Sequence, residues 1–322
     1  MLGAGALADA LGPRMVPLTL VAFGLAAMFP ALAGSVPALF VLLLAVGVTT
    51  GMLDVAINSE ASRLEAAFRV RVMDGLHAAF SAGVLVGGAG TGLLRKAGAH
   101  PSWILFGIGA LTVLTAALNR ASREALSVAP RQRLTWPGKG LVIVGAVLAL
   151  AFVVESGLEQ WSALFLERTL DSSPAVSGLG PGLFAAAMAA SRLLAQRFAR
   201  VSVPARMLFC GAAAAAGIVI CATAQHAVVA LVGIVVAGGG VGLAAPTLFG
   251  AAGRIGGEGG RGAAVSTVAI LSYLGFLAGP PLIGAVAGAT SLRGGFLFLC
   301  ATAVLLALCA PTLRRAARES PG

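Results

Sequence analysis

Ten long runs of apolar residues dominate this sequence, and they limit what the chain can fold into more than any other feature. The runs cover approximately residues 15–33, 36–57, 75–94, 101–119, 139–160, 176–198, 207–224, 227–250, 263–288 and 292–312. A helix needs about 20 apolar residues to cross the ~30 Å hydrocarbon core of a bilayer. Backbone groups without hydrogen-bond partners are costly in lipid, so each run is predicted to be a transmembrane helix.

Composition supports an integral membrane protein and argues against other classes. Charged residues make up 11% of the chain and hydrophobic residues 58%, against roughly 25% and 45–50% in soluble domains. The net charge of +10 comes from short basic clusters between apolar runs, which does not indicate nucleic-acid binding. The four cysteines lie inside apolar runs without metal-site or disulfide spacing, so no metal or other cofactor is expected.

The distribution of basic residues predicts the orientation. If the N-terminus is cytoplasmic, the outer loops hold only Arg95, Lys96, Arg168 and Arg293, and every other Lys and Arg falls inside. Cytoplasmic loops of membrane proteins carry an excess of Lys and Arg. We therefore expect a multi-pass protein of the plasma (inner) membrane with both termini in the cytoplasm.

The sequence also contains an internal repeat. Three glycines of the first part recur in the second part at the same mutual spacing: Gly83, Gly87 and Gly92 correspond to Gly275, Gly279 and Gly284. The repeat predicts two parallel helical halves, an N-terminal half at 1–119 and a C-terminal half of six helices at 139–322, joined by a basic cytoplasmic linker at 120–138. Because the first half is shorter, we expect helix 1 and most of helix 2 to be absent, so that the ten spans are helices 3 to 12.

Two loops carry a recognisable signature. Residues 5–14, GALADALGPR, resemble the cytoplasmic loop signature of the major facilitator superfamily. The resemblance implies an all-α integral membrane bundle of two halves, in which Asp9 and Arg14 help to hold a cytoplasmic gate shut. Arg192 and Arg197 resemble the matching gate signature of the second half, although Gln196 replaces its acid. An ordinary polar turn is the alternative interpretation of the first loop.

Three further stretches point to a branch of that superfamily. Residues 53–58, LDVAIN, are similar to a stretch of the fucose permeases. Residues 73–83 and 155–166 resemble a related bacterial branch of permeases. The resemblance implies transport by alternating access, in which two halves rock around a central cavity.

Acidic residues within apolar runs are candidates for the transport pathway. Asp54 shares one helix face with Gly47, Gly51 and Asn58 because these residues are spaced i, i+4, i+7 and i+11. A carboxylate inside the membrane costs about 2.5–3.5 kcal/mol on insertion scales. We therefore expect Asp54 and Asn58 to face a cavity or a partner; an interfacial acid is the alternative.

Glu155, Glu159 and His77 are further candidates. Glu155 and Glu159 are one helical turn apart, near the expected outer end of their helix, where they could line the mouth of the pathway or form a solvated helix end. His77 could accept a proton near neutral pH, although a histidine at the start of a helix is commonly just solvated.

These features predict a secondary-active permease for a small organic solute, with proton coupling and a sugar-like substrate implied by the resemblance. A drug or metabolite efflux transporter and a non-transporting truncated remnant are the alternatives. We do not expect an enzyme, because the sequence has no histidine cluster and no Ser-His-Asp set. The expected partners are the solute, protons and the lipid bilayer, and the expected state is a monomer.

Overall fold

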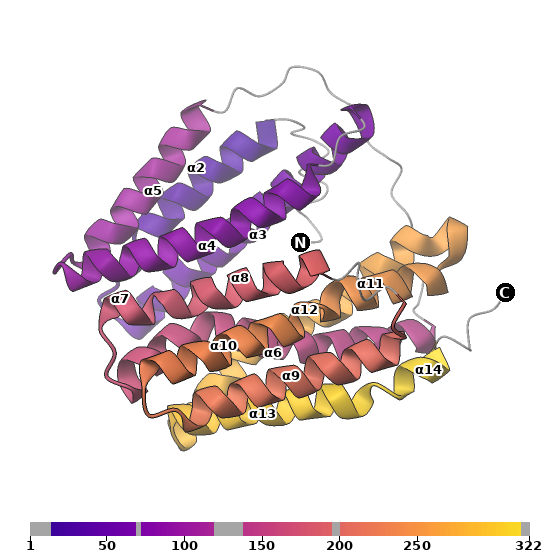
Figure 1. Cartoon of the computed structure of the whole chain (residues 1–322). Coiled ribbons are helices and arrows are strands. Elements are labelled where there is room, and N and C mark those ends of the chain that lie inside the picture. Colours follow the sequence, from indigo (N-terminus) through magenta and orange to yellow (C-terminus); the bar gives the residue numbers. More distant parts are fainter. Residues whose placement is uncertain (1–13, 69–71, 119–137, 195–199, 317–322) are drawn as a thin grey trace. The chain divides into compact units, whose positions relative to one another are not determined.

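Every regular element that the structure describes is a helix. The computed structural model describes residues 14–68, 72–118, 138–194 and 200–316, and within these ranges it contains no strand (Figure 1). The helices group into two compact units. Unit 1 comprises residues 1–79 and 94–130, and unit 2 comprises residues 80–93 and 131–322.

Unit 1 is built around α2, which packs against α5 and α3. Its elements are α2 (Met15–Met28), the short 3-10 helix η2 (Pro30–Leu32), α3 (Val36–Phe68), the beginning of α4 (Met73–Lys96) and α5 (Pro101–Leu118). Helices α2 and α5 approach closely at Gly24 and Gly109, because a Cβ on Gly24 would lie 2.8 Å from the carbonyl oxygen of Gly109. Small residues at such positions let helix backbones come together in a membrane.

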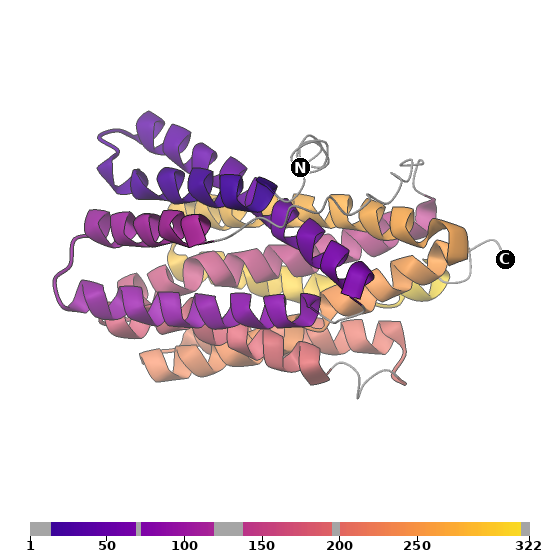
Figure 2. The same cartoon turned by 90° about the horizontal axis from the view of Figure 1, so that it is seen from above.

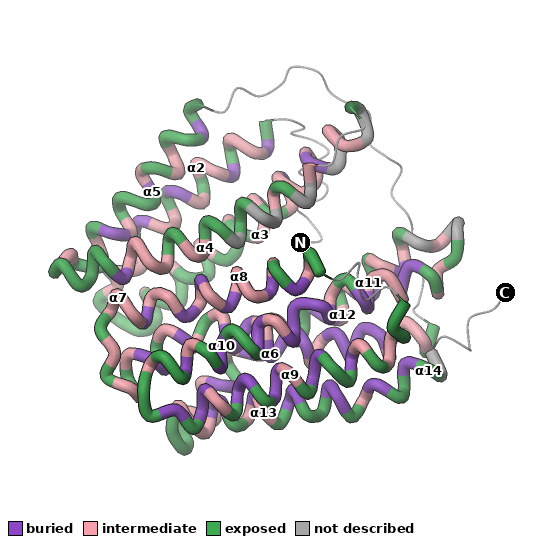
Figure 3. The backbone as a smooth tube through the Cα atoms, viewed as in Figure 1, coloured by how far each residue is buried: buried purple, intermediate pink, exposed green. Residues whose placement is uncertain are grey.

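Unit 2 is centred on a long helix, α6, which packs against α8, α11, α12 and α13. The elements are α6 (Lys139–Thr169), α7 (Pro174–Ser177), α8 (Leu179–Leu194), α9 (Val203–Thr223), α10 (Ala227–Val241), α11 (Ala244–Ile255), α12 (Gly257–Ala289), α13 (Leu292–Cys309) and α14 (Thr312–Ala316). Buried residues concentrate on α6 and on the faces of α9, α10 and α13 (Figure 3). These helices run alongside one another and form the core of the unit (Figure 2).

Local signals in the sequence explain several helix ends. Proline stands at the first position of α5 and of α7, where its missing N–H would have no partner in the helix anyway. Ser202 and Ser291 cap α9 and α13, since their hydroxyl oxygens accept hydrogen bonds from backbone N–H groups three residues later. These caps fix where each helix begins.

Arg293 links two helices at the end of unit 2 that is expected to face outside. It lies at the start of α13, and its guanidinium donates to the carbonyl oxygens of Ala222 and Ala224 at the end of α9. The same guanidinium lies 5.9 Å from the ring centroid of Phe165 on α6. A positive charge at the C-terminal end of a helix is favourable. This contact gives Arg293 a structural role that links α13 to the end of α9.

The structure confirms the predicted all-helical membrane bundle over the described residues. Each of the ten predicted runs corresponds to a helix or to a pair of adjoining helices, and eight helical stretches of the described residues are long and apolar enough to cross a membrane. The remaining two are α8, which has only 16 residues, and the glycine-rich α4. Many large apolar side chains are exposed, including Phe40 at 67% and Leu277 at 75%, as expected for surfaces in contact with lipid.

The helices differ from the apolar runs in two respects. Helices α3 and α6 continue to Phe68 and Thr169, past the predicted ends at 57 and 160, because a helix can extend beyond the hydrocarbon core into water. The predicted run at 227–250 is divided into α10 and α11 at Gly242 and Leu243. The linker at 120–138 falls almost wholly on residues outside the described ranges, so the proposed boundary between two functional halves stays a prediction.

The repeated glycines play different parts. A Cβ on Gly275 of α12 would collide with the backbone of α6 at Ala149, and a Cβ on Gly279 would lie 2.5 Å from Oγ of Ser156 and 3.1 Å from the carbonyl oxygen of Val153. These glycines therefore let the two helices pack closely. No heavy atom lies within 4 Å of the corresponding position at Gly83. The same is true of Gly87, whereas a Cβ on Gly92 would collide with the carbonyl oxygen of Pro174 on α7. Close packing therefore accounts for Gly275, Gly279 and Gly92, but not for Gly83 or Gly87.

Candidate functional site

Glu155 lies in the middle of α6, not near its outer end as the sequence suggested. The helix has 31 residues, and at 1.5 Å per residue Glu155 is about 24 Å from its start and about 21 Å from its end. The prediction was wrong because the helix extends beyond the apolar run. The side chain of Glu155 is only 16% exposed, which excludes the alternative of a solvated helix end at this position.

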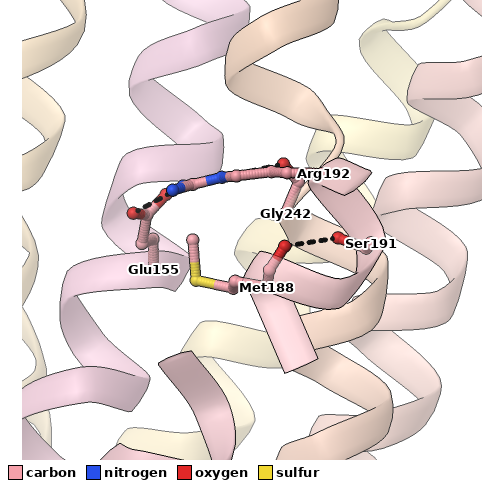
Figure 4. A network of polar contacts seen from close by, with 5 residues as sticks. All are labelled: Glu155, Met188, Ser191, Arg192 and Gly242. Carbon is pink, nitrogen blue, oxygen red and sulfur yellow. Dashed lines mark hydrogen bonds and ion pairs between the residues drawn. The ribbon is translucent and has the colours of Figure 1, made fainter. Parts of the chain in front are cut away.

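Arg192 is the partner of Glu155. It lies in the last turn of α8, and its Nη2 atom is 3.4 Å from Oε1 of Glu155 (Figure 4). The Arg192 side chain is 37% exposed. The structure thus brings together a residue expected in the pathway and a residue expected in the cytoplasmic gate, which are 37 positions apart in the sequence.

The second contact of Arg192 depends on a proline. Its Nε atom donates to the carbonyl oxygen of Gly242 at 3.3 Å (Figure 4). In a continuous helix this carbonyl would accept from the N–H four residues later, but residue 246 is Pro246, which has no N–H. Arg192 supplies the missing donor at the junction of α10 and α11.

Gly242 also has to be small. A Cβ there would lie 2.9 Å from both Cα and the carbonyl oxygen of Met188 and would collide with Oγ of Ser191. Ser191 Oγ donates to the Met188 carbonyl at 3.0 Å. Helices α8 and α10 therefore meet closely beside the ion pair, and this contact holds Arg192 at the level of Glu155 (Figure 4).

A polar stripe continues along α6 from the ion pair. Glu155, Glu159 and Ser162 are spaced i, i+4 and i+7 and so share one face of the helix. Glu159 is half-buried and lies within the electrostatic range of both Glu155 and Arg192. The cluster thus holds two carboxyl groups and one guanidinium.

Ser162 was missed in the sequence, although its spacing from Glu155 could have revealed it. It is fully buried, and its Oγ atom has no hydrogen-bond partner among the described residues. It faces α8 at Gly180, where a Cβ would lie 3.1 Å from this oxygen. Buried hydroxyl groups normally have a partner, so this end of the stripe has capacity for a polar group or water.

Asp54 and Asn58 form a pair of their own on α3 in unit 1. The Asn58 side-chain amide donates to Oδ1 of Asp54 at 2.9 Å and to the Asp54 backbone carbonyl at 2.8 Å. Asp54 is exposed and Asn58 is half-exposed. The pairing gives the carboxylate one polar neighbour one turn away, and the role of Asp54 in transport stays a prediction.

The remaining predicted residues are described only in part. Asp9 and Arg197 lie outside the described residues, and so does the side chain of His77 on α4. Arg14 is exposed just before α2. The proposed contacts of the gate therefore stay predictions. Within the described ranges, no group of three His, Cys, Asp or Glu side chains is arranged to hold a metal ion.

Comparisons with known proteins identify the family. The family model of the Major Facilitator Superfamily matches residues 1–260. An uncharacterized MFS-type transporter of Yersinia pestis is 32% identical over 260 residues, which cover 79% of this chain and 67% of that protein. An uncharacterized transporter of Sinorhizobium fredii is 29% identical over 97% of this chain and 84% of its own length.

Solved structures agree with this fold. A bacterial homolog of the human lysosomal transporter Spinster superposes with a TM-score of 0.74 at 16% identity, covering 98% of this chain and 86% of that one. The fucose:proton symporter of E. coli superposes with a TM-score of 0.54 at 13% identity, covering 97% and 86%. The sequence matches and the helical bundle lead to one conclusion: this chain belongs to the Major Facilitator Superfamily of membrane transporters.

Proposed function

We propose that this transporter carries a small organic solute by alternating access and couples its movement to protons. The observation that carries the proposal is the ion pair between Glu155 and Arg192 in the middle of the membrane-spanning helix α6. Charged residues within membrane spans are costly and mark substrate or proton pathways. A pair with a nearby second carboxyl group, Glu159, can take up a proton without leaving an isolated charge.

The chemistry of the pair supports coupling. An ionised carboxylate can only accept hydrogen bonds, whereas a protonated carboxyl group can also donate one. Protonation of Glu155 weakens its attraction to Arg192 and frees the N–H donors of the two Nη groups, while Nε stays bonded to the Gly242 carbonyl. A proton can thus change how α6 is bound to α8, and such a change is what a coupled transporter needs between its two states.

A sugar-like substrate fits the polar groups of the stripe. Carboxyl groups, a hydroxyl and a guanidinium can hydrogen-bond the hydroxyl groups of a polyol or sugar. The similarity of residues 53–58 to the fucose permeases favours the same class. We extend to this chain, as a proposal, the proton coupling that the name of the E. coli fucose:proton symporter states for that protein.

Reconstituted vesicles test the proposal. A panel of sugars and polyols is first screened for stabilisation of the purified protein, and uptake of a hit is then driven by a pH gradient. Wild-type protein should accumulate the solute, whereas Glu155→Gln should lose accumulation but keep exchange without a gradient, because it cannot release a proton. Accumulation by Glu155→Gln at the wild-type level would refute a coupling role for this pair.

A further inference from the structure

The helical hydrogen bonding of the span formed by α10 and α11 is interrupted at Pro246. The two helices meet at Gly242 and Leu243, and both residues keep helical backbone angles (φ −58°, ψ −25° and φ −78°, ψ −15°). Just beyond, Thr247 N donates to the Leu243 carbonyl at 3.3 Å, as in a regular helix. The backbone therefore follows a helical path, and what it lacks is the bond to the Gly242 carbonyl that the proline cannot make.

The helices on the two sides of this interruption pack against different neighbours. Helix α10 packs mainly against α8 and α9, whereas α11 packs mainly against α12 and α6. Gly242 fixes the end of α10 to α8, because a Cβ there would lie 2.9 Å from Cα of Met188. Helices kink at proline, where a hydrogen bond of the helix is missing. Helix α11 can therefore tilt relative to α10 without losing a further helical bond.

The missing bond is replaced by a side chain that is itself bound to an acid. Nε of Arg192 donates to the Gly242 carbonyl at 3.3 Å, and Nη2 of the same guanidinium lies 3.4 Å from Oε1 of Glu155 (Figure 4). A guanidinium is planar and rigid, so the carboxylate that holds one edge of it also fixes the other edge. The junction of α10 and α11 is thereby tied to α6.

The charged groups around Glu155 leave this tie dependent on its ionisation. Among the described residues, Arg192 from α8 and Glu159 from α6 itself act on Glu155. On the other helices that pack against α6, the described charged side chains lie at helix ends: Arg254 in the last turn of α11, Arg293 at the start of α13 and Arg314 in α14. A change in the charge of Glu155 therefore acts first on Arg192.

We infer that Pro246 is a positioning residue that ties the angle between α10 and α11 to the ionisation of Glu155. Ionised Glu155 anchors Arg192, and through it the Gly242 carbonyl, on α6. When the carboxylate takes up a proton, Arg192 stays on Gly242 but is no longer anchored on α6. Helix α11, the expected cytoplasmic part of the span, is then free to tilt. The inference rests on the proposed coupling role of Glu155 and extends it to α11.

Replacing the proline removes the tie without opening a cavity. Pro246 is exposed and the residues at the junction are already helical, so Pro246→Ala supplies an N–H to the Gly242 carbonyl. Helix α11 is then held by its own hydrogen bond, whatever Arg192 does. Hydrogen exchange of the α11 amides reports local opening. It is measured by mass spectrometry on the full chain in lipid nanodiscs, at one pH, for wild type, Glu155→Gln, Pro246→Ala and the double variant.

Glu155→Gln represents the neutral acid and should speed α11 exchange about threefold. The reason is that a charge-assisted hydrogen bond is about twice as strong as the neutral one that glutamine still accepts. In the Pro246→Ala background the same substitution should have no effect on α11. Proton-driven accumulation should be lost in Pro246→Ala. The matched control is Pro281→Ala, which removes an exposed proline from α12 and should leave both accumulation and the threefold response intact.

The inference fails if Glu155→Gln leaves α11 exchange unchanged, or if it speeds exchange equally with and without Pro246, as expected of a purely structural kink. Wild-type accumulation by Pro246→Ala would also overturn it. Failure of the proposed function is a separate result, namely wild-type accumulation by Glu155→Gln. Should Glu155→Gln not fold, wild type and Pro246→Ala are compared at acidic and neutral pH with α9 exchange as the reference. An α11 response that survives in Pro246→Ala then refutes the inference.

Discussion

Removing Arg192 should destabilise the protein more than removing Glu155, although both substitutions break the same ion pair. Arg192→Gln leaves Glu155, a carboxyl group that is 16% exposed in the middle of α6, one turn from the second acid, Glu159. It also removes the donor to the Gly242 carbonyl. Glu155→Gln leaves an arginine that is 37% exposed and still bonded to Gly242.

The exposure and the contact distance of the ion pair set the expected losses in the free energy of unfolding. Exposed ion pairs contribute about 0.2–1 kcal/mol, and removing one partner of a fully buried pair costs about 3–5 kcal/mol. This pair is intermediate in exposure and makes a single contact at 3.4 Å. Removing Arg192 while Glu155 remains should therefore cost about 1–2 kcal/mol through the loss of the ion pair. The lost hydrogen bond to Gly242 adds about 1 kcal/mol. Arg192→Gln should therefore cost about 2–3 kcal/mol and Glu155→Gln about 1 kcal/mol or less.

Thermal unfolding of the purified protein in nanodiscs measures these differences as shifts in Tm, at roughly 2–4 °C per kcal/mol. Arg192→Gln should lower Tm by roughly 5 °C or more, and Glu155→Gln by less than half of that. The loss of Tm in the double variant should be smaller than the sum of the two single losses, because it removes both members of the ion pair and leaves only Glu159 as a charged group in the cluster. Equal losses that add in the double variant would refute the reasoning, since they would mean that the two side chains do not interact.

The remaining predictions concern unit 1 and the topology. Asp54→Asn should abolish proton-driven accumulation and leave folding intact, which parallel uptake and Tm measurements check; accumulation at the wild-type level would make Asp54 an interfacial acid only. Gly109→Ala should cost about 1–3 kcal/mol, because its Cβ would lie 2.5 Å from Met28 Cγ and collide with the carbonyl oxygen of Gly24. The matched control Gly107→Ala meets open space and should be neutral or slightly stabilising in the same Tm assay. Reporter fusions at residues 130 and 318 should both report the cytoplasm, and an external signal from either would overturn the predicted orientation.

The choice of site residues shows where sequence reasoning stopped. Acids in apolar runs are visible in the sequence because lipid penalises them, and Glu155 and Glu159 were found in this way. Their surroundings were not visible. Nothing in the sequence around Arg192 indicates that it reaches α6, since the short loop signature that drew attention to it predicts a gate. The pairing of Arg192 with Glu155 depends on where along α6 the last turn of α8 lies.

The sequence alone determined that the chain lies in a lipid bilayer, that it is helical, and approximately where each helix runs. Backbone groups in lipid need hydrogen-bond partners within the protein, so every long apolar run is expected to form a helix. Tertiary structure decided where those helices end and which polar side chains meet. It placed Glu155 in mid-helix opposite Arg192, and it used the carbonyl freed by Pro246 to hold that arginine in place. Contacts of this kind are set by helix depth and by the close approach of backbones at residues such as Gly242. Several arrangements of the same helices would satisfy the apolar pattern equally well, so the pattern cannot select among them.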